Sequence, residues 1–289
     1  TEVSAAVAKA AIKSGVARKT ITDWDAYKKS LMELLGQESK LTRKLHDTAR
    51  LHPQRVVFAE GGHPTMMKAA VQAKTEGICQ PILLGNPDRL NRLAQRLKLD
   101  LSDIEIIDMR ADQEQGRRAT YAKHLAKKRA RQGYNFEEAY DKMYERNYFG
   151  MMMVETGEAD AFITGLYTKY SNTIKVAKEV VGIRPEYKTF ATMHILNTKK
   201  GTFYIADTLI NRHPDENVLM DVAKLSAHTV QFFNEEPHIA MISYSNFGTD
   251  EVGSPMKVHL AVEEMQKQYP YLAIDGEMQV NFALNKELR

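Results

Sequence analysis

Short apolar runs alternate with longer helical patterns through the first half of the chain. The runs RVVFAE (55–60), PILLG (81–85) and IEIIDM (104–109) have the length and composition of buried strands. Between them, GGHPTMMKAAVQAKTEG places a proline in a first helical turn and ends on a glycine, and NPDRLNRLAQRLKL follows as the next helix. This alternation predicts an α/β protein with a mostly parallel sheet that is covered by helices on both faces.

A helical region at 114–157 interrupts the alternation, which then resumes. Its stretch YDKMYERNYFGMMMV carries more methionine and aromatic side chains than one core face needs. That excess predicts either an interface helix in a homo-oligomer, a dimer or larger, or a helix buried inside one lobe. The later predicted strands are ADAFITG (159–165), TFATMHIL (189–196), TFYIAD (202–207), HIAMISYS (238–245) and LAIDGEM (272–278), separated by three further helical patterns.

Composition narrows the class of protein. The 289 residues suffice for two domains, and 40 basic against 37 acidic residues give a net charge of only +3, which argues against nucleic-acid binding. The single cysteine, Cys79, excludes an internal disulfide framework and fits a reducing cytoplasm, where a small core residue is its simplest role. We expect neither a signal peptide nor a membrane span, and because the chain starts with Thr1 we expect it to be a piece of a longer protein.

Three of the predicted strands end in small polar residues, which is where open α/β sheets collect ligands. Thr164 and Gly165 end one strand, Asp207 ends another, and the turn SYSNFGT follows a third. In that turn, Ser243, Ser245, Asn246 and Gly248 offer hydroxyl, amide and backbone donors rather than a serine nucleophile, since no G-x-S-x-G elbow is present. These ends predict a binding site, most simply for an anion.

The sequence offers further candidates for phosphate, anion and metal sites, each with a structural alternative. Gly61 and Gly62 follow a strand and precede a helix, where a tight turn is the simpler alternative to a phosphate site. The cluster of Lys127, Lys128, Arg129 and Arg131 is either a solvated helix end or an anion site. The nine histidines show no metal-binding spacing, so we assign neither a metal site nor a catalytic residue to this chain.

The motifs taken together resemble one family. RVVFAEGGHPTMMKAA, EGICQPILLGNPDRL, YFGMMMVETGEADAFITG, FYIADTLINRHPDE, IAMISYSNFGT and AIDGEMQVNFAL occur in the order found in phosphate acetyltransferases, over roughly residues 40–289. SYSNFG, DGEM and LNKELR are similar to the form of the domain that is fused, at the C-terminal end, to NADP-dependent malic enzyme in bacterial hybrid proteins. AAVAKAAIKSGVARKTITDWDAYKKSL resembles the closing helix of the malic enzyme domain and its linker.

The resemblance implies a two-lobed, isocitrate dehydrogenase-like fold with a cleft between the lobes. We expect a closing helix and linker at 1–38, a first lobe at 39–185 and a C-terminally incomplete second lobe at 186–289. One family arginine falls on Arg129, and a second falls on Lys175, which keeps the charge but not the planar fork for bidentate phosphate contact. These two residues would hold the anionic end of acetyl-CoA and the serine turn its acyl end.

For function, the resemblance implies a regulatory and oligomerisation domain that binds acetyl-CoA as an allosteric inhibitor and is not itself catalytic. The parent enzyme would convert malate to pyruvate with NADP and Mg²⁺ or Mn²⁺ in its own domain. This chain stops at Arg289, before the late segment that carries catalytic groups in the transferases, so we expect acyl transfer by this chain to be absent. The alternative is an active phosphate acetyltransferase or phosphate butyryltransferase, which moves an acyl group between CoA and phosphate.

Overall fold

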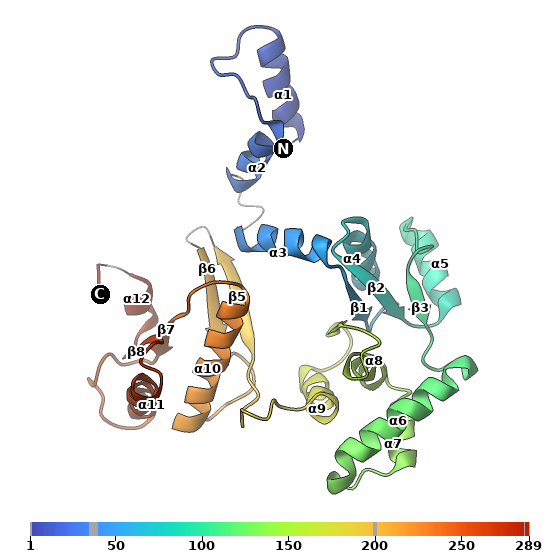
Figure 1. Ribbon diagram of the computed structural model, residues 1–289, viewed down its shortest axis with the longest axis vertical. Helices are drawn as coiled ribbons and strands as arrows, with labels where there is room; N and C mark the ends of the chain where they lie inside the picture. The colour runs from blue at the N-terminus through green and yellow to red at the C-terminus, as the bar shows by residue number, and fades with distance from the viewer. Residues whose placement is uncertain (1, 35–39, 199–200, 286, 289) are drawn as a thin grey trace. The chain divides into compact units, whose positions relative to one another are not determined.

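The computed structural model describes residues 2–34, 40–198, 201–285 and 287–288. The chain forms two compact units, which are coloured by residue number in Figure 1. The four-stranded unit is Lys40–Gly182, and the two-sheet unit combines Thr1–Ser39 with Ile183–Arg289. The division falls between Gly182 and Ile183, and the lobes expected at 39–185 and 186–289 stay a prediction.

A parallel sheet organises the four-stranded unit. Its strand order is β3-β2-β1-β4, and every neighbouring pair is parallel. Chain order therefore runs outward from β1 on one side, whereas β4 joins β1 on the other, which is a topological switch point. The strands are β1 (Gln54–Phe58), β2 (Cys79–Leu84), β3 (Glu105–Ile107) and β4 (Ala161–Ile163).

Helices cover both faces of this sheet because alternate residues of each strand point to opposite sides. Val56, Phe58 and Leu83 pack in one cluster with residues of two helices, α4 (Pro64–Thr75) and α5 (Pro87–Leu97). Val57 and Leu84 pack on the opposite face. The helices and short turns that follow β3 are η1 (Asp112–Glu114), α6 (Gln115–Arg129), η2 (Ala130–Gln132), α7 (Phe136–Lys142), α8 (Arg146–Glu155) and α9 (Tyr170–Val180), and residues of α6, α7, α8 and α9 pack in this second cluster. Helix α3 (Lys40–Leu51) precedes β1, and its Arg50 donates to the carbonyl of Glu76 at the end of α4.

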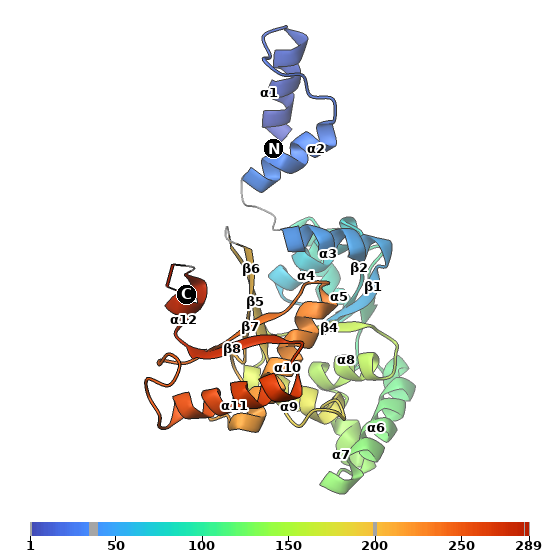
Figure 2. The same cartoon turned by 60° about the vertical axis from the view of Figure 1, so that its left-hand side comes forward.

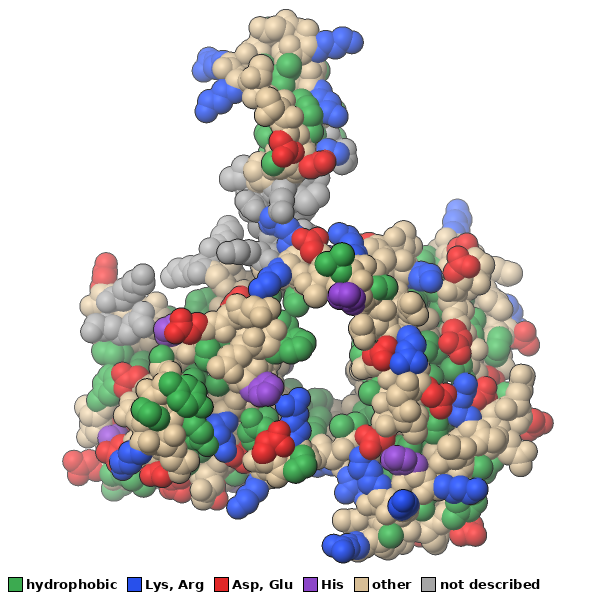
Figure 3. Space-filling view, viewed as in Figure 1, with side chains coloured by type: hydrophobic (Ala, Val, Ile, Leu, Met, Phe, Trp, Pro, Cys, Tyr) green, Lys and Arg blue, Asp and Glu red, His purple; other side chains and the backbone are tan. Residues whose placement is uncertain are grey.

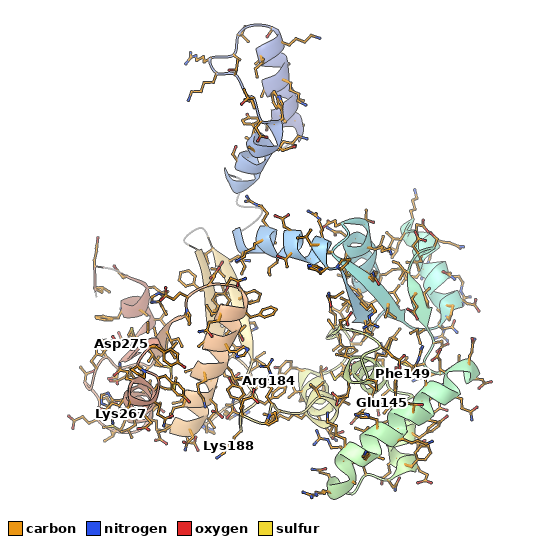
Figure 4. The ribbon with its side chains drawn as sticks, in the orientation of Figure 1. Glu145, Phe149, Arg184, Lys188, Lys267 and Asp275 are labelled. Carbon is orange, nitrogen blue, oxygen red and sulfur yellow. The ribbon has the colours of Figure 1, made fainter. Side chains whose placement is uncertain are left out.

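Helix α8 lies inside the unit rather than on its surface. Every residue from Asn147 to Met153 is buried, and Figure 4 labels Phe149 on this helix. A Cβ on Gly150 would collide with the ring of Phe162 on β4, so glycine is needed where the helix crosses the strand. The methionine-rich stretch is therefore a core element of one unit, which is the second of the two alternatives that the sequence left open.

The two-sheet unit contains two separate pairs of strands. The pair β5 (Met193–Thr198) and β6 (Gly201–Ala206) is antiparallel, whereas β7 (His238–Ile242) and β8 (Ala273–Met278) are parallel. Helices α10 (Glu216–Phe232) and α11 (Ser254–Gln268) lie side by side, and α11 covers β8 (Figures 1 and 2). Short helices complete the unit: α1 (Glu2–Lys13), α2 (Trp24–Leu34) and α12 (Val280–Leu284).

The predicted α/β class and mostly parallel sheets are confirmed. Cys79 is 8% exposed and belongs to the core beneath α4, as predicted. On the face shown in Figure 3, basic and acidic side chains interleave over the four-stranded unit.

Candidate functional site

A pocket of about 790 Å³ opens at the carboxyl edge of the parallel sheet. Ala59 follows β1, Gly85 and Asn86 follow β2, and Arg110 lies three residues after β3. The opposite wall comes from the start of α8 and from α9. The size falls within the range of small-molecule sites, and the carboxyl edge is where ligands bind to open α/β sheets. We refer to it as the arginine pocket.

Three guanidinium groups line this pocket, those of Arg89, Arg110 and Arg146. Within the described part of the chain, the side chains of Arg89 and Arg110 have no hydrogen-bond or ion-pair partner, and Arg146 only lies against the Tyr167 ring at 5.6 Å. Helices α5, α8 and α9 all begin at the pocket wall, so their partly positive N-termini add to the same field. Unpaired cations near several helix N-termini favour an anionic ligand.

Two carboxylates also line the pocket, those of Asp108 and Glu145. Asp108 already accepts hydrogen bonds from Asn86 Nδ2 at 3.1 Å and from the backbone N–H of Arg110 at 3.1 Å. Glu145 is exposed and is the N-cap residue of α8, the helix that carries Phe149 (both labelled in Figure 4). The lining therefore carries a positive excess, with one carboxylate engaged in holding the loop that carries Arg110.

A buried arginine holds two walls of the pocket from behind. Arg118 is 2% exposed and donates from Nη1 to the carbonyls of Met109 at 2.7 Å and Ala111 at 2.8 Å, on either side of Arg110. Its guanidinium also lies 4.6 Å from the ring centroid of Tyr144, which lines the pocket. The guanidinium of Arg118 is thus occupied by hydrogen bonds that hold the loop, whereas the guanidinium of Arg110 remains available to a ligand.

A buried glutamate fixes the turn after β4. Glu60 is 1% exposed and accepts hydrogen bonds from the backbone N–H of Gly165 at 3.2 Å and of Tyr167 at 3.5 Å. The hydroxyl of Thr164 lies 3.0 Å from Glu60 Oε1 and 3.0 Å from Asn147 Oδ1. Thr164 and Gly165, which the sequence proposed as ligand contacts, therefore bind Glu60 and shape the turn that presents Tyr167.

Glycine makes close approach possible beside this turn. A Cβ on Gly61 would lie 3.0 Å from the carbonyl oxygen of Leu84 and 3.2 Å from Leu83 Cβ, so the close packing of the two strand ends favours glycine at this position. Gly62 lines the arginine pocket, where a Cβ would meet only Leu90 at 3.9 Å. The simple turn interpretation fits Gly61, whereas Gly62 also belongs to the candidate site.

The serine turn lies in the two-sheet unit. Ser245 is buried, and its hydroxyl is 2.7 Å from Thr249 Oγ1. Asn246 Oδ1 accepts the backbone N–H of Gln279 at 2.8 Å, and the Ser243 N–H donates to the carbonyl of Met278 at 2.9 Å. These bonds fasten the turn to the end of β8, so the groups that the sequence offered to a ligand are largely engaged within the turn.

A second buried glutamate supports the serine turn. Glu277 is fully buried, and its Oε1 accepts the backbone N–H of Gly248 at 2.6 Å. Its Oε2 has no hydrogen-bond partner within the described residues and lies 3.4 Å from Nδ1 of His259, an ion-pair contact when the histidine is protonated. The other ring nitrogen of His259 lies 3.5 Å from Glu263.

The remaining predicted residues lie outside the arginine pocket lining. Arg129 donates from Nε to the carbonyl of Glu179 at 2.6 Å and from Nη2 to that of Lys178, so it caps the end of α9. Lys175 is exposed and lies 3.9 Å from Glu179 Oε1. These positions do not test ligand contact, and the two residues stay predicted contacts.

The carboxylate of Asp207 accepts several hydrogen bonds from neighbouring groups of the protein. Its carboxylate accepts the Thr192 hydroxyl at 2.7 Å and the Asn211 backbone N–H at 2.6 Å, among other donors of the same loop. Burial opposes its ionisation, but these hydrogen bonds outweigh burial and lower the pKa of Asp207 to about 2. Asp207 therefore organises the loop after β6, and its contact with a ligand stays a prediction.

Sequence reasoning missed the arginines of the pocket. Arg89, Arg110 and Arg146 come from three separate segments, and although Arg89 lies within the family stretch EGICQPILLGNPDRL, no spacing in the sequence marks the three as one site. Arg89 and Arg110 do lie within five residues of predicted strand ends, which is the signal that could have found them. In the described residues, no group of three or more histidine, cysteine, aspartate or glutamate side chains could hold a metal ion. No described helix has both the length and the apolar character that a bilayer span requires.

Comparison with known sequences shows to which protein family the chain belongs. Residues 40–289 match the family described as phosphate acetyl/butaryl transferase. The NADP-dependent malic enzyme of Escherichia coli (strain K12) is 34% identical over 100% of this chain, which spans 38% of that protein's length. The phosphate acetyltransferase of Thermoanaerobacterium thermosaccharolyticum is 31% identical over 86% of this chain and 76% of its own. The predicted resemblance to the transferase-like domain of malic enzymes is confirmed.

Solved structures agree on the fold. The EutD phosphotransacetylase from Staphylococcus aureus matches with a TM-score of 0.76 and 26% identity, over 86% of this chain and 75% of its own. A phosphotransacetylase from Streptococcus pyogenes matches with a TM-score of 0.74 and 26% identity, over 85% and 75%. By sequence and by fold, the chain belongs to the phosphate acetyl/butaryl transferase family.

Proposed function

We propose that this chain is the regulatory domain of an NADP-dependent malic enzyme and binds acetyl-CoA as an inhibitor. The observation that carries the proposal is the extent of the two alignments. The E. coli malic enzyme aligns with the whole chain, including α1 and α2, whereas the family match begins at residue 40. The segment outside the transferase family is thus shared with malic enzymes.

The proposed parent reaction is the oxidative decarboxylation of malate to pyruvate, with NADP and Mg²⁺ or Mn²⁺ held by the malic enzyme domain. Acetyl-CoA would regulate it by binding the inhibited state more tightly than the active state. Anion binding by the chain is supported by the arginine pocket and by the exposed ammonium group of Lys175.

The proposal that the domain is not catalytic is supported by how its polar groups are used. Arg129, the family arginine in this chain by resemblance, donates to carbonyls at the end of α9 and would have to break those bonds to reach a phosphate. The hydroxyl of Ser245 is buried against Thr249 rather than against a base. Each group is stabilising the fold.

A second candidate function is acyl transfer between CoA and phosphate. It is favoured by the 31% identity to a phosphate acetyltransferase, of which this chain spans 76%. The two candidates differ in a simple assay, because only the second forms acetyl phosphate from acetyl-CoA and phosphate.

The test uses the longer malic enzyme chain that contains this sequence. Calorimetry should show acetyl-CoA binding, malate oxidation should fall as acetyl-CoA is added, and acetyl phosphate formation should remain at background. Lys175→Ala should weaken acetyl-CoA binding by up to about tenfold, because one charge-assisted contact is lost. Lys178→Ala, one turn further along α9, is the matched control. Acetyl phosphate turnover, or malate oxidation that acetyl-CoA leaves unchanged, would refute the regulatory proposal.

We also propose that the protein is a homo-oligomer of at least two copies. The burial of α8 inside one unit removes the sequence argument for an interface at that helix. The proposal therefore rests on the regulatory role alone, and sedimentation at micromolar concentration tests it. A single species with the mass of one chain would exclude it.

A further inference from the structure

The arginine pocket has features beyond a general attraction for anions. Arg89 lies in the first turn of α5, which follows β2, and Arg110 lies in the loop after the neighbouring strand β3. Two free planar guanidinium groups on segments that follow adjacent strands can each hold a different phosphate by paired hydrogen bonds. An isolated inorganic ion would leave much of a 790 Å³ pocket unfilled, so the volume favours a larger phosphorylated molecule.

The pocket lining also contains an aromatic ring, that of Tyr167, which comes from the segment between β4 and α9. Tyr167 lines the pocket, yet its side chain is 59% exposed. Its ring is flanked by His63, with centroids 5.2 Å apart in an edge arrangement, and by the guanidinium of Arg146. Its backbone is held by Glu60, so the exposed ring is preorganised without being covered. A flat heteroaromatic base is the ligand group that such a ring stacks well.

Two further polar side chains, those of Glu145 and Asn172, line the same pocket. Glu145 is an exposed carboxylate without a capping hydrogen bond, and Asn172 supplies an amide from the first turn of α9. A carboxylate beside a phosphate site accepts hydrogen bonds from the hydroxyls of a ribose. Asp108 is already engaged with Asn86, which leaves Glu145 as the acceptor among the two.

From these features we infer that the arginine pocket binds a nucleoside phosphate, with phosphates on Arg89 and Arg110 and the base against Tyr167. Two sources share this chemistry: the nucleotide end of CoA, and a free adenine nucleotide. The first source rests on the proposed function, because it makes the pocket the anchor of the inhibitor. The second is independent of it.

The first experiment measures binding of ADP, of adenosine 3′,5′-bisphosphate and of pyrophosphate to the full-length protein by calorimetry. We expect both nucleotides to bind, and Arg89→Gln and Arg110→Gln each to weaken them by about tenfold or more. Tyr167→Ala should weaken the nucleotides several-fold and leave pyrophosphate unchanged, which separates base stacking from charge. Arg96→Ala is the matched control, because Arg96 lies on α5 about 10 Å beyond Arg89 and outside the pocket lining.

Competition between acetyl-CoA and ADP distinguishes the two sources of the nucleotide. It also distinguishes this inference from the proposed regulatory function. If acetyl-CoA displaces ADP, the pocket holds the nucleotide end of CoA; if both bind at once, it holds a free nucleotide. Acetyl-CoA inhibition that survives intact in Arg89→Gln and Arg110→Gln, together with no nucleotide binding, would overturn this inference and leave the proposed function standing. Arginine-dependent ADP binding without any acetyl-CoA binding would support the inference and refute the proposed function. Circular dichroism spectra that match the wild type ensure that lost binding reflects the pocket.

Discussion

Each unit of the molecule buries one glutamate beneath a turn that follows a parallel strand, but the two glutamates are used differently. Glu60 accepts from two backbone N–H groups and lies beside the Thr164 hydroxyl, so both its oxygens are engaged. Glu277 accepts one backbone N–H on Oε1, while among the described residues Oε2 has only His259 within ion-pair distance. Glu60 therefore gives its turn several hydrogen bonds, whereas Glu277 gives the serine turn one, and that turn is held in addition by Ser243, Asn246 and Gln279.

The difference has a consequence for binding. A turn that is held by several hydrogen bonds can present an exposed ring such as Tyr167 in one orientation, which lowers the entropy lost when a ligand binds. The serine turn takes one backbone bond from its buried glutamate and relies for the rest on other contacts, such as those of Asn246 and Gln279. The arginine pocket therefore stands beside the turn whose buried glutamate makes more hydrogen bonds.

Replacing Glu60 should produce the largest effect. In Glu60→Ala the N–H groups of Gly165 and Tyr167 lose their acceptor beneath the turn, and we expect a loss of about 3 kcal/mol or more in the free energy of unfolding. Urea unfolding followed by far-UV circular dichroism, with amide exchange at Gly165, measures it. Glu60→Gln keeps one acceptor oxygen and should fall between wild type and Glu60→Ala. Equal stabilities of all three proteins would contradict the role of Glu60.

Replacing Glu277 should cost less. Glu277→Ala removes the acceptor of the Gly248 N–H, and one unsatisfied donor corresponds to about 1–3 kcal/mol. Amide exchange at Gly248 should accelerate while exchange at Gly165 stays unchanged, because the two amides belong to different units. A larger loss than in Glu60→Ala would reverse the comparison between the two turns.

Acid should weaken the two-sheet unit through Asp207, a carboxylate that is as fully satisfied as Glu60. Its folded-state pKa of about 2 lies below the ordinary 3.8, so the stabilisation is complete above pH 3.8 and is lost as the pH falls towards 2. Urea midpoints between pH 5 and pH 2.5 should fall more steeply in the wild type than in Asp207→Asn. The variant would be less stable at pH 5. Parallel pH profiles would exclude this contribution.

The smallest effect is expected at His259. Its side chain is 39% exposed, and partly exposed ion pairs contribute about 1 kcal/mol or less. His259→Gln should therefore lower the stability of the two-sheet unit by less than Glu277→Ala does, when both are measured in the same buffer. A cost that equals that of Glu277→Ala would show that His259 is the main partner of the buried carboxylate.

The sequence predicted the parallel sheet well because each strand is a compact apolar run with a glycine or a cap nearby. Val57 and Leu84 sit in such runs, and periodicity alone places them in a core. The same reasoning could not assign α8, because a helix that is apolar all round looks alike in a core and at an interface. Only the packing of Gly150 against Phe162 settled where it lies.

The candidate site was less predictable, for a physical reason. Polar residues at strand ends such as Thr164 and Asp207 fit a binding site by pattern, yet in the structure they hydrogen-bond within their own turns. The free cations, Arg89 and Arg110, look like ordinary surface residues in the sequence. What distinguishes them is that no described side chain neutralises them, and such pairing depends on three-dimensional neighbours that local sequence does not contain.

Cys79 gives the molecule a built-in reporter. It is the only thiol in the chain, it begins β2 beneath α4, and burial raises its pKa, so both access and thiolate formation are suppressed while the sheet is closed. Reaction of an alkylating reagent with Cys79 is therefore favoured by transient opening of the four-stranded unit. The rate at which Cys79 is labelled therefore reports how often this unit opens. A ligand that occupies the arginine pocket should lower that rate without contacting the cysteine.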